Sequence, residues 1–389
     1  MKKLLALLYL FAAQLQAQNY FLYVAAESDD TVSLLKFDGD NISELERFDV
    51  GYYPTEIEGP HGITVGPNGD YWYLSLAHGN PFGKLIKYST KDNKVVGETS
   101  LGLFPATMQI SSVTGLLYCV NFNLHGKMNP STVSVVDPET MTEIKKITTG
   151  AMPHGSRMSP DGLKQYSVSM MSSELYEIDA LDLSVSRKMD LENNMSDKKM
   201  MTKKISMNHS MDNKKMMNSA KGMNHPNNEN EKEHPMEMKN GMHMSDVKPT
   251  WVIHHPTKKT LYVAGNGSNE IIEIDSEKWK ITKRIKTQKG PYNVEVSPNG
   301  KYLVATLKGE GSTAVWDLEN NYKTNIIKNS TTVSHGIAIS NDSKYAFVSV
   351  EGVGGEPGIV DVINLDDPKL ISSVEVGKQA GGIAFWKTD

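Results

Sequence analysis

The chain has 389 residues, a formal net charge of −5 and a pI near 6.1. A mildly acidic chain lacks the clustered positive charge of a nucleic-acid binder, so no nucleic-acid partner is expected. A single cysteine, Cys119, excludes an internal disulfide framework. No segment after the N-terminus approaches the roughly 18 apolar residues of a membrane helix, so no membrane span is expected.

The N-terminus has the parts of a secretory signal. Met1-Lys2-Lys3 is followed by an apolar run from Leu4 to Ala13 and by the small residue Ala17. A basic start, a short apolar core and a small residue at the cut are typical of a cleaved signal peptide. We predict a signal peptide over 1–17 and a periplasmic or secreted mature chain.

Strand-like segments follow at 20–26 and 31–35, and then one phrase recurs along the chain. It consists of a Pro or small residue, a variable residue, a short apolar strand, a turn such as Ser-Pro-Asp-Gly, and a second apolar strand. Glycine and asparagine accept the positive φ that such hairpin turns need. Copies of the phrase begin at seven residues: Pro60, Pro105, Pro153, Pro249, Pro291, Ser334 and Ala380.

The spacing of the copies indicates the fold. Successive copies begin 45, 48, 96, 42, 43 and 46 residues apart, and a period of about 40–50 residues with four short strands is typical of a propeller blade. The last copy ends after one strand, and the N-terminal segments at 20–26 and 31–35 supply the missing strands. We predict an all-β fold, a seven-bladed β-propeller over 18–389 whose last blade is closed by strands from both chain ends.

The repeats resemble those of a known family. Residues 261–275 read Leu-Tyr-Val-Ala-Gly-Asn-Gly-Ser-Asn-Glu-Ile-Ile-Glu-Ile-Asp, which is similar to the repeat of the YVTN family of bacterial β-propellers. The resemblance covers 20–389 apart from one insertion. It implies the propeller fold but no single activity, because relatives of this shape include lactonases, cytochrome-like and copper-enzyme propellers, and surface proteins.

The 96-residue spacing is about one blade too long. Residues 154–189 already supply four strands, whereas 190–247 contain no Phe, Tyr or Trp and almost no β-branched residue, so that they cannot build a sheet. We predict a disordered insertion over 190–247 between the third and fourth blades. Its lysines and acidic residues balance at nine each, which does not fit a polybasic arm.

The insertion has the composition of a copper-binding segment. Of the chain's 21 methionines, 13 lie between Met189 and Met244, together with four of its 11 histidines. Thioether sulfur is a soft ligand that favours Cu(I), while imidazole binds both copper oxidation states. The segment resembles the Met/His-rich parts of bacterial copper-resistance and copper-transport proteins, which implies copper rather than zinc. The candidate ligands are Met207, His209, Met211, Met223, His225, His234, Met236, Met238, Met242, His243 and Met244. The alternative is a low-complexity linker without a ligand.

Histidines outside the insertion recur at related repeat positions. His61, His154 and His335 each stand second in the innermost strand of a blade, where the other blades have Ala106, Thr250, Tyr292 and Gly381. His78 and His125 lie in connections between second and third strands, which share one face of a propeller with the connections between blades. We therefore expect all five histidines, and the insertion, at one mouth of the central channel.

Carboxylates are expected beside these histidines. Glu27 and Glu351 align at the ends of the second strands in two blades. Three or four imidazoles around the axis would suit copper or zinc at about 2.0 Å. The alternative is that the imidazoles only bond the backbone of a neighbouring blade. His254 and His255 fall in a turn on the opposite face and are not expected to be ligands.

Three functions are compatible with the sequence. The first is an exported, monomeric copper-binding propeller that captures, sequesters or delivers the ion to a copper-handling partner, or performs redox chemistry with it. A histidine-rich mouth also resembles the catalytic propeller of nitrous oxide reductase, but the sequence contains no cupredoxin-type copper domain, so that activity is not expected. The second is a lactonase-like hydrolase, for which Arg157 is the sole arginine on an inner strand. The third is a non-catalytic surface scaffold.

Overall fold

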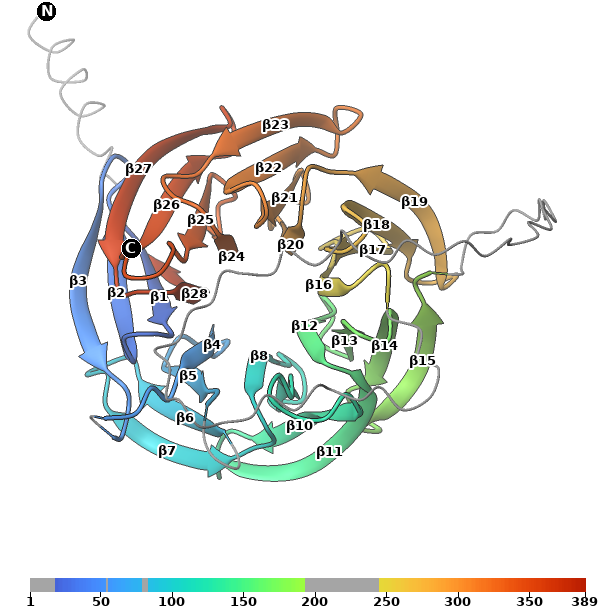
Figure 1. Ribbon diagram of the computed structural model, residues 1–389, viewed down its shortest axis with the longest axis horizontal. Helices are drawn as coiled ribbons and strands as arrows, with labels where there is room; N and C mark the ends of the chain where they lie inside the picture. Colours follow the sequence, from blue (N-terminus) through green and yellow to red (C-terminus); the bar gives the residue numbers. More distant parts are fainter. Residues whose placement is uncertain (1–17, 54, 79–82, 193–244) are drawn as a thin grey trace, which may run out of the picture. The chain divides into compact units, whose positions relative to one another are not determined.

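The computed structural model describes residues 18–53, 55–78, 83–192 and 245–389. Within them the regular secondary structure consists of strands alone, arranged in seven antiparallel sheets of four. The predicted seven-bladed β-propeller is confirmed (Figure 1). The described part of the chain contains no helix that could cross a membrane. The predicted signal peptide and residues 193–244 of the predicted insertion lie outside the described residues.

We number the blades from the first copy of the repeat, each from its innermost to its outermost strand. Blade 1 contains β4 (Pro60–Val65), β5 (Tyr71–Leu76), β6 (Lys84–Ser89) and β7 (Val95–Ser100). Blade 2 contains β8 (Pro105–Ile110), β9 (Leu117–Asn121), β10 (Pro130–Asp137) and β11 (Thr142–Ala151). Blade 3 contains β12 (Pro153–Met158), β13 (Lys164–Ser169), β14 (Glu174–Asp179) and β15 (Ser184–Asp190). Blade 4 contains β16 (Pro249–His254), β17 (Thr260–Gly265), β18 (Glu270–Asp275) and β19 (Lys280–Lys286). Blade 5 contains β20 (Pro291–Val296), β21 (Tyr302–Leu307), β22 (Ser312–Asp317) and β23 (Lys323–Lys328). Blade 6 contains β24 (Ser334–Ile339), β25 (Tyr345–Val350), β26 (Gly358–Asn364) and β27 (Lys369–Val376). Blade 7 contains β28 (Ala380–Thr388), β1 (Tyr20–Ala26), β2 (Thr31–Phe37) and β3 (Ile42–Asp49).

The innermost strands surround a central axis, and each contacts the innermost strand of the next blade (Figure 1). Blade 7 combines both chain ends, because C-terminal β28 pairs antiparallel with N-terminal β1. The residues at the two ends are tied by reciprocal backbone hydrogen bonds of 2.9 Å between Asn19 and Asp389. The predicted closure is therefore confirmed, because strands from both chain ends belong to one four-stranded sheet.

The repeated turns explain why these residues form hairpins. In three blades the serine that opens the turn accepts a hydrogen bond from the backbone N–H five residues later: Ser159 from Lys164, Ser297 from Tyr302, and Ser340 from Tyr345. Glycines close the turns of blades 1, 3 and 5 at positive φ, between +70° and +76°. A glycine reaches this region without the steric cost that a Cβ would add.

The hydrophobic core lies between adjacent blades. Between blades 7 and 1, Tyr23 stacks on the fully buried Trp72 with ring centroids 5.0 Å apart. The only cysteine, Cys119, is also fully buried, and burial raises the pKa of its thiol. Cys119 thus packs as a small buried hydrophobic residue.

One face of the ring is defined by a hydrogen bond found in all seven blades. The residue after the second strand donates its backbone N–H to the carbonyl of the residue just before the innermost strand. Connections between blades therefore share this face, here called the mouth face, with the connections between second and third strands. The residues before the innermost strands all have positive φ: Gly59, Phe104, Met152, Lys248, Gly290, Val333 and Gln379. This conformation belongs to the repeat rather than to one site.

The described residues that border the insertion also lie on the mouth face. Leu191 donates its backbone N–H to the carbonyl of Ser173 at 2.8 Å, and Gly267 donates to Val247 at 2.9 Å. Ser173 and Gly267 belong to connections between second and third strands. Both borders of the insertion are therefore on the side that the repeat predicts.

Candidate functional site

Three histidines from blades 1, 3 and 6 meet at the axis. His61, His154 and His335, here called the axial histidines, stand second in β4, β12 and β24 and are all buried. The ring centroid of His61 lies 6.1 Å from that of His154 and 6.0 Å from that of His335. The shared repeat position thus brings them together as expected.

Packing demands the glycine of each Pro-His-Gly motif but not the histidine. A Cβ on Gly62 would lie 1.9 Å from the carbonyl oxygen of Ala106 in the next blade, and one on Gly155 would lie 2.4 Å from that of Thr250. The position before each glycine has no such restriction, because other blades place Ala106 or Gly381 there. The fold itself therefore does not require an imidazole at the axial position.

In each axial histidine, Nδ1 faces a hydrogen-bond acceptor. Nδ1 lies 2.9 Å from Oε2 of Glu27 in His61, 3.0 Å from the Thr250 carbonyl in His154, and 3.2 Å from the Gly381 carbonyl in His335. The expected alternative, a bond to the backbone of a neighbouring blade, holds for two of the three. Because all three partners accept, Nδ1 carries a proton in each ring.

Glu27 links two of the predicted site histidines. Its Oε2 contacts His61, and its Oε1 lies 2.8 Å from Nε2 of His78. Burial alone would raise the pKa of Glu27, but His61 and His78 together hold it well below its ordinary value. The carboxylate is therefore ionised and fixes both imidazoles.

His78 and His125 form the outer part of the cluster. Their ring centroids are 5.5 Å apart, and the exposed ring of His125 has no hydrogen-bond partner among the described residues. Phe104 packs edge-on against His61, His78 and His125, with centroids 5.1 to 5.6 Å away. All five predicted histidines outside the insertion thus belong to one continuous cluster on the mouth face.

The other side of the axis carries groups that sequence reasoning did not select. Tyr292 donates its hydroxyl to Nε2 of His154 at 2.8 Å, and its ring lies 4.7 Å from that of His335. Lys308 lies 2.7 Å from Glu351 and 4.5 Å from the centroid of the Tyr292 ring. Their repeat positions were the available signal, because Tyr292 aligns with the axial histidines and Lys308 with Glu27 and Glu351.

Burial keeps two axial imidazoles neutral. Burial, followed by the nearby His61, lowers the pKa of His154 to about 3. Burial, followed by the charge of Lys308, lowers the pKa of His335 well below its ordinary range. Nε2 of His335 lies 3.5 Å from Glu351. At neutral pH both rings therefore offer lone pairs rather than charge.

No group of three or more His, Cys, Asp or Glu side chains within the described ranges is already arranged to hold a metal ion. His254 and His255 lie apart from the site, the first at the end of β16 and the second in the turn that follows it. Nδ1 of His255 accepts the backbone N–H of Lys258 at 2.9 Å, as the hydroxyl of the turn residue Ser111 accepts that of Thr114 in blade 2. The ligands predicted from Met207 to Met244 lie outside the described residues.

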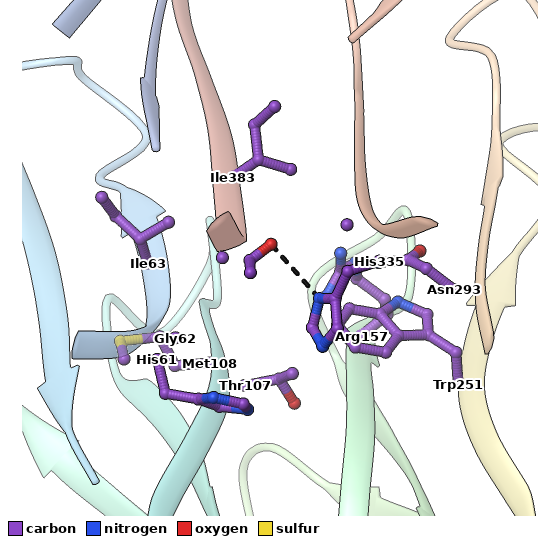
Figure 2. A pocket seen from close by; sticks show the side chains of 13 residues that line it. His61, Gly62, Ile63, Thr107, Met108, Arg157, Trp251, Asn293, His335 and Ile383 are labelled. Carbon is purple, nitrogen blue, oxygen red and sulfur yellow. Dashed lines mark hydrogen bonds between the residues drawn. The ribbon is translucent and has the colours of Figure 1, made fainter. Parts of the chain in front are cut away.

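A small cavity lies beneath the axial histidines. Figure 2 shows His61 on one wall and Arg157, Trp251 and Asn293 on the other. The cavity offers about 30 Å³ to the centres of water-sized molecules, which is room for about two waters. Oδ1 of Asn293 is buried there without a hydrogen-bond partner.

Arg157, which lines this cavity, belongs to an ion pair. Nε of Arg157 donates to Glu295 at 2.8 Å, and its guanidinium lies 4.9 Å from the centroid of a Trp251 ring. Burial raises the pKa of Glu295, although Arg157 opposes this shift. The Arg157 guanidinium is thus already paired with the carboxylate of Glu295.

The chain is similar in fold to several solved structures. It shares 12% identity with the periplasmic gluconolactonase PpgL of Pseudomonas aeruginosa, with a TM-score of 0.67 over 95% of this chain and 99% of that one. It shares 11% with a putative 6-phosphogluconolactonase of Bacteroides fragilis, with a TM-score of 0.62 over 96% and 99%. The hydrazine synthase of Kuenenia stuttgartiensis is 19% identical, with a TM-score of 0.57 over 81% of each chain.

Identities this low support the shared fold alone. None of the curated proteins matches the sequence of this chain. A family profile does match, over residues 108–383, which is well over half of the sequence. The chain therefore belongs to the YNCE-like beta-propeller family.

Proposed function

We propose that this protein is an exported copper-binding propeller whose metal site is the cluster of histidines on the mouth face. The observation that carries the proposal is the use of Nδ1 by all three axial histidines. Metal-binding histidines usually donate their other ring N–H to a carboxylate or a carbonyl, which fixes the ring and directs the free nitrogen at the ion. Here this leaves three Nε2 atoms for the axis.

The spacing of the rings suits a shared ion after small side-chain movements. Two imidazoles that bind one ion at about 2.0 Å have ring centroids about 5–6 Å apart. The two spacings from His61 are 6.0 and 6.1 Å. The low pKa values of His154 and His335 favour the neutral rings that a cation needs.

Copper is favoured over other ions by the sequence of the insertion. Its methionines offer neutral, soft donors that suit Cu(I) and that remain unprotonated at any ordinary pH. We infer that the insertion captures copper, that the mouth face binds it, and that the protein sequesters the ion or passes it to a partner. Zinc is the less favoured ion, because thioethers add little to its binding.

Copper binding at the mouth is tested by metal analysis of the isolated protein and by titration with Cu(II). The double variant His61→Gln/His335→Gln removes two axial donors, and we expect its affinity to fall at least about 10-fold. His254→Gln is the matched control, because His254 is the last residue of β16, at the opposite end of the strand from the axial position. Equal affinity of the double variant and the control would overturn the proposed site.

The insertion is tested separately by deletion of 195–244 and competition for Cu(I). We expect the deleted protein to lose most of its Cu(I) stoichiometry while keeping the Cu(II) bound at the mouth. An unchanged Cu(I) stoichiometry would leave the insertion without a role in copper binding. This outcome would not affect the site at the axis.

A second candidate is hydrolysis of a lactone, favoured by the buried Glu27–His61 pair. An imidazole held by a carboxylate is a suitable general base, and the fold resembles that of the periplasmic gluconolactonase. The cavity below has room for waters only, so a sugar-sized lactone would lie above the axial histidines. Gluconolactone hydrolysis that is lost in Glu27→Gln and insensitive to copper chelators would favour this candidate.

A further inference from the structure

Tyr292 occupies the position of the ring that corresponds to the axial histidines. It is the second residue of β20, just as His61, His154 and His335 are second in their strands. Its hydroxyl lies 2.8 Å from Nε2 of His154, and its ring lies against that of His335. Four donor-bearing side chains from four blades therefore face one axis, three with nitrogen and one with oxygen.

The distance from Tyr292 to His154 matches that between two neighbouring ligands of one ion. Donor atoms held at about 2.0 Å and at right angles around a metal are about 2.8 Å apart. We propose that the Tyr292 oxygen is itself a ligand, which completes a set of three imidazole nitrogens and one phenolate oxygen. This inference rests on the proposed copper site and names the donor set and oxidation state of that site.

A mixed nitrogen and oxygen set favours Cu(II) over Cu(I). Tetragonal sites with nitrogen and oxygen donors are typical of Cu(II), whereas Cu(I) prefers soft sulfur ligands. On binding, Cu²⁺ forms a bond to the phenolic oxygen and replaces its proton, which passes to solvent. The copper is neither oxidised nor reduced in this exchange.

A phenolate ligand also lowers the charge that the ion brings to the axis. The groups facing the axis include the carboxylates of Glu27 and Glu351 and the ammonium of Lys308, which lies over the Tyr292 ring. Cu²⁺ bound by a phenolate adds one positive charge to this buried cluster, whereas Cu²⁺ bound by an intact phenol adds two. The smaller added charge has the smaller desolvation cost.

A phenolate bound to Cu(II) gives a visible charge-transfer absorption that imidazole ligands do not give. We expect this band when Cu(II) is added to the wild-type protein, and we expect its loss in Tyr292→Phe. The variant should still bind Cu(II), with at least about 10-fold lower affinity, and should release about one proton fewer per ion in calorimetry across buffers. Tyr118→Phe is the control, since the buried Tyr118 hydroxyl donates to the carbonyl of Ala180 at 3.2 Å, away from the axis.

The outcomes separate this inference from the proposed function. Copper that binds through His61 without a charge-transfer band, or a band that persists in Tyr292→Phe, overturns the phenolate ligand and leaves the histidine site intact. A wild-type protein that binds no Cu(II) overturns both. If Tyr292→Phe fails to fold, resonance Raman spectra of the wild-type complex still decide the matter, because phenolate vibrations must appear on excitation in the band.

Discussion

The buried, neutral imidazole of His154 makes the stability of the fold depend on pH. His154 has 1% of its surface exposed, its pKa is lowered to about 3, and both of its ring nitrogens have partners. In the unfolded chain the same group has a pKa of about 6.5. Between these two values the unfolded state binds one more proton than the folded state, so folding stability falls as pH falls.

This linkage predicts a measurable loss of stability in mild acid. For His154 alone, lowering the pH from 7.5 to 5.5 is expected to reduce the free energy of unfolding by about 1.4 kcal/mol. His154→Gln removes this contribution, so its stability should depend less on pH than that of the wild type by that amount. Urea unfolding at the two pH values measures the difference. Equal pH dependence in both proteins would mean that folding leaves the pKa of His154 unchanged.

Glu27 acts on the site through the two histidines that it holds. Its two oxygens contact His61 at 2.9 Å and His78 at 2.8 Å, and the side chain is buried. Glu27→Gln keeps the shape but replaces one acceptor by a donor and removes the charge. We expect copper affinity to fall about 10–100-fold, as is usual when a partner of a metal-binding histidine is lost.

A matched control for Glu27→Gln is Glu351→Gln. Glu351 aligns with Glu27 but pairs with Lys308, and it approaches His335 only to 3.5 Å. Its loss should weaken Cu(II) binding less than the loss of Glu27. If both variants bind copper like the wild type, the carboxylates do not position the ligands.

At the scale of the strand, the glycine after each axial histidine sets how closely neighbouring blades approach. A Cβ on Gly62 would lie 1.9 Å from a backbone oxygen of β8, which cannot move without shifting the whole strand. Gly62→Ala is therefore expected to destabilise the protein by about 2–3 kcal/mol, through overpacking. Gly355→Ala is the control, because nothing lies within 4 Å of its added Cβ. A similar denaturation midpoint for both variants would contradict this account.

The sequence predicted strands and faces better than contacts across the axis. Pro, Gly and turn residues recur at a fixed spacing, and this local pattern was enough to place His61, His154 and His335 around one channel. The Tyr292–His154 contact joins residues 138 positions apart, in blades 3 and 5. The Arg157–Glu295 pair has the same separation. Such contacts depend on the diameter and closure of the ring, which no local pattern encodes.

The alignment of the repeats did place Tyr292 and Glu27 at the axis. Tyr292 aligns with the axial histidines in the repeat, but the alignment does not show that its hydroxyl reaches His154. Glu27 was placed correctly at the end of β1, yet its two histidine partners follow only from the contact of blade 7 with blade 1. The positions were therefore predictable, whereas the pairing of side chains was not.

At the scale of the whole molecule, blade 7 holds the ring closed without a covalent link. Its innermost strand, β28, contacts the innermost strands of blades 1 and 6 and pairs with β1 from the other chain end. Removing 380–389 would leave those neighbours with exposed apolar surface and an unpaired strand edge. The truncated chain serves as the open-ring reference for the prediction that follows.

A circular permutant tests whether closure depends on the strand pairing itself or on where the chain ends. The backbone bonds between Asn19 and Asp389 place the termini side by side, so that a short Asn-Gly turn can join β28 to β1. New termini between Gly354 and Gly355 fall in an exposed connection where added Cβ atoms meet nothing within 4 Å. Because every sheet is preserved, we expect cooperative unfolding within about 4 °C of the wild-type Tm, a shift that corresponds to about 3 kcal/mol for a propeller of this size. The truncated chain should lose this transition, and a permutant that unfolds like the truncated chain would show that the native termini are themselves needed for closure.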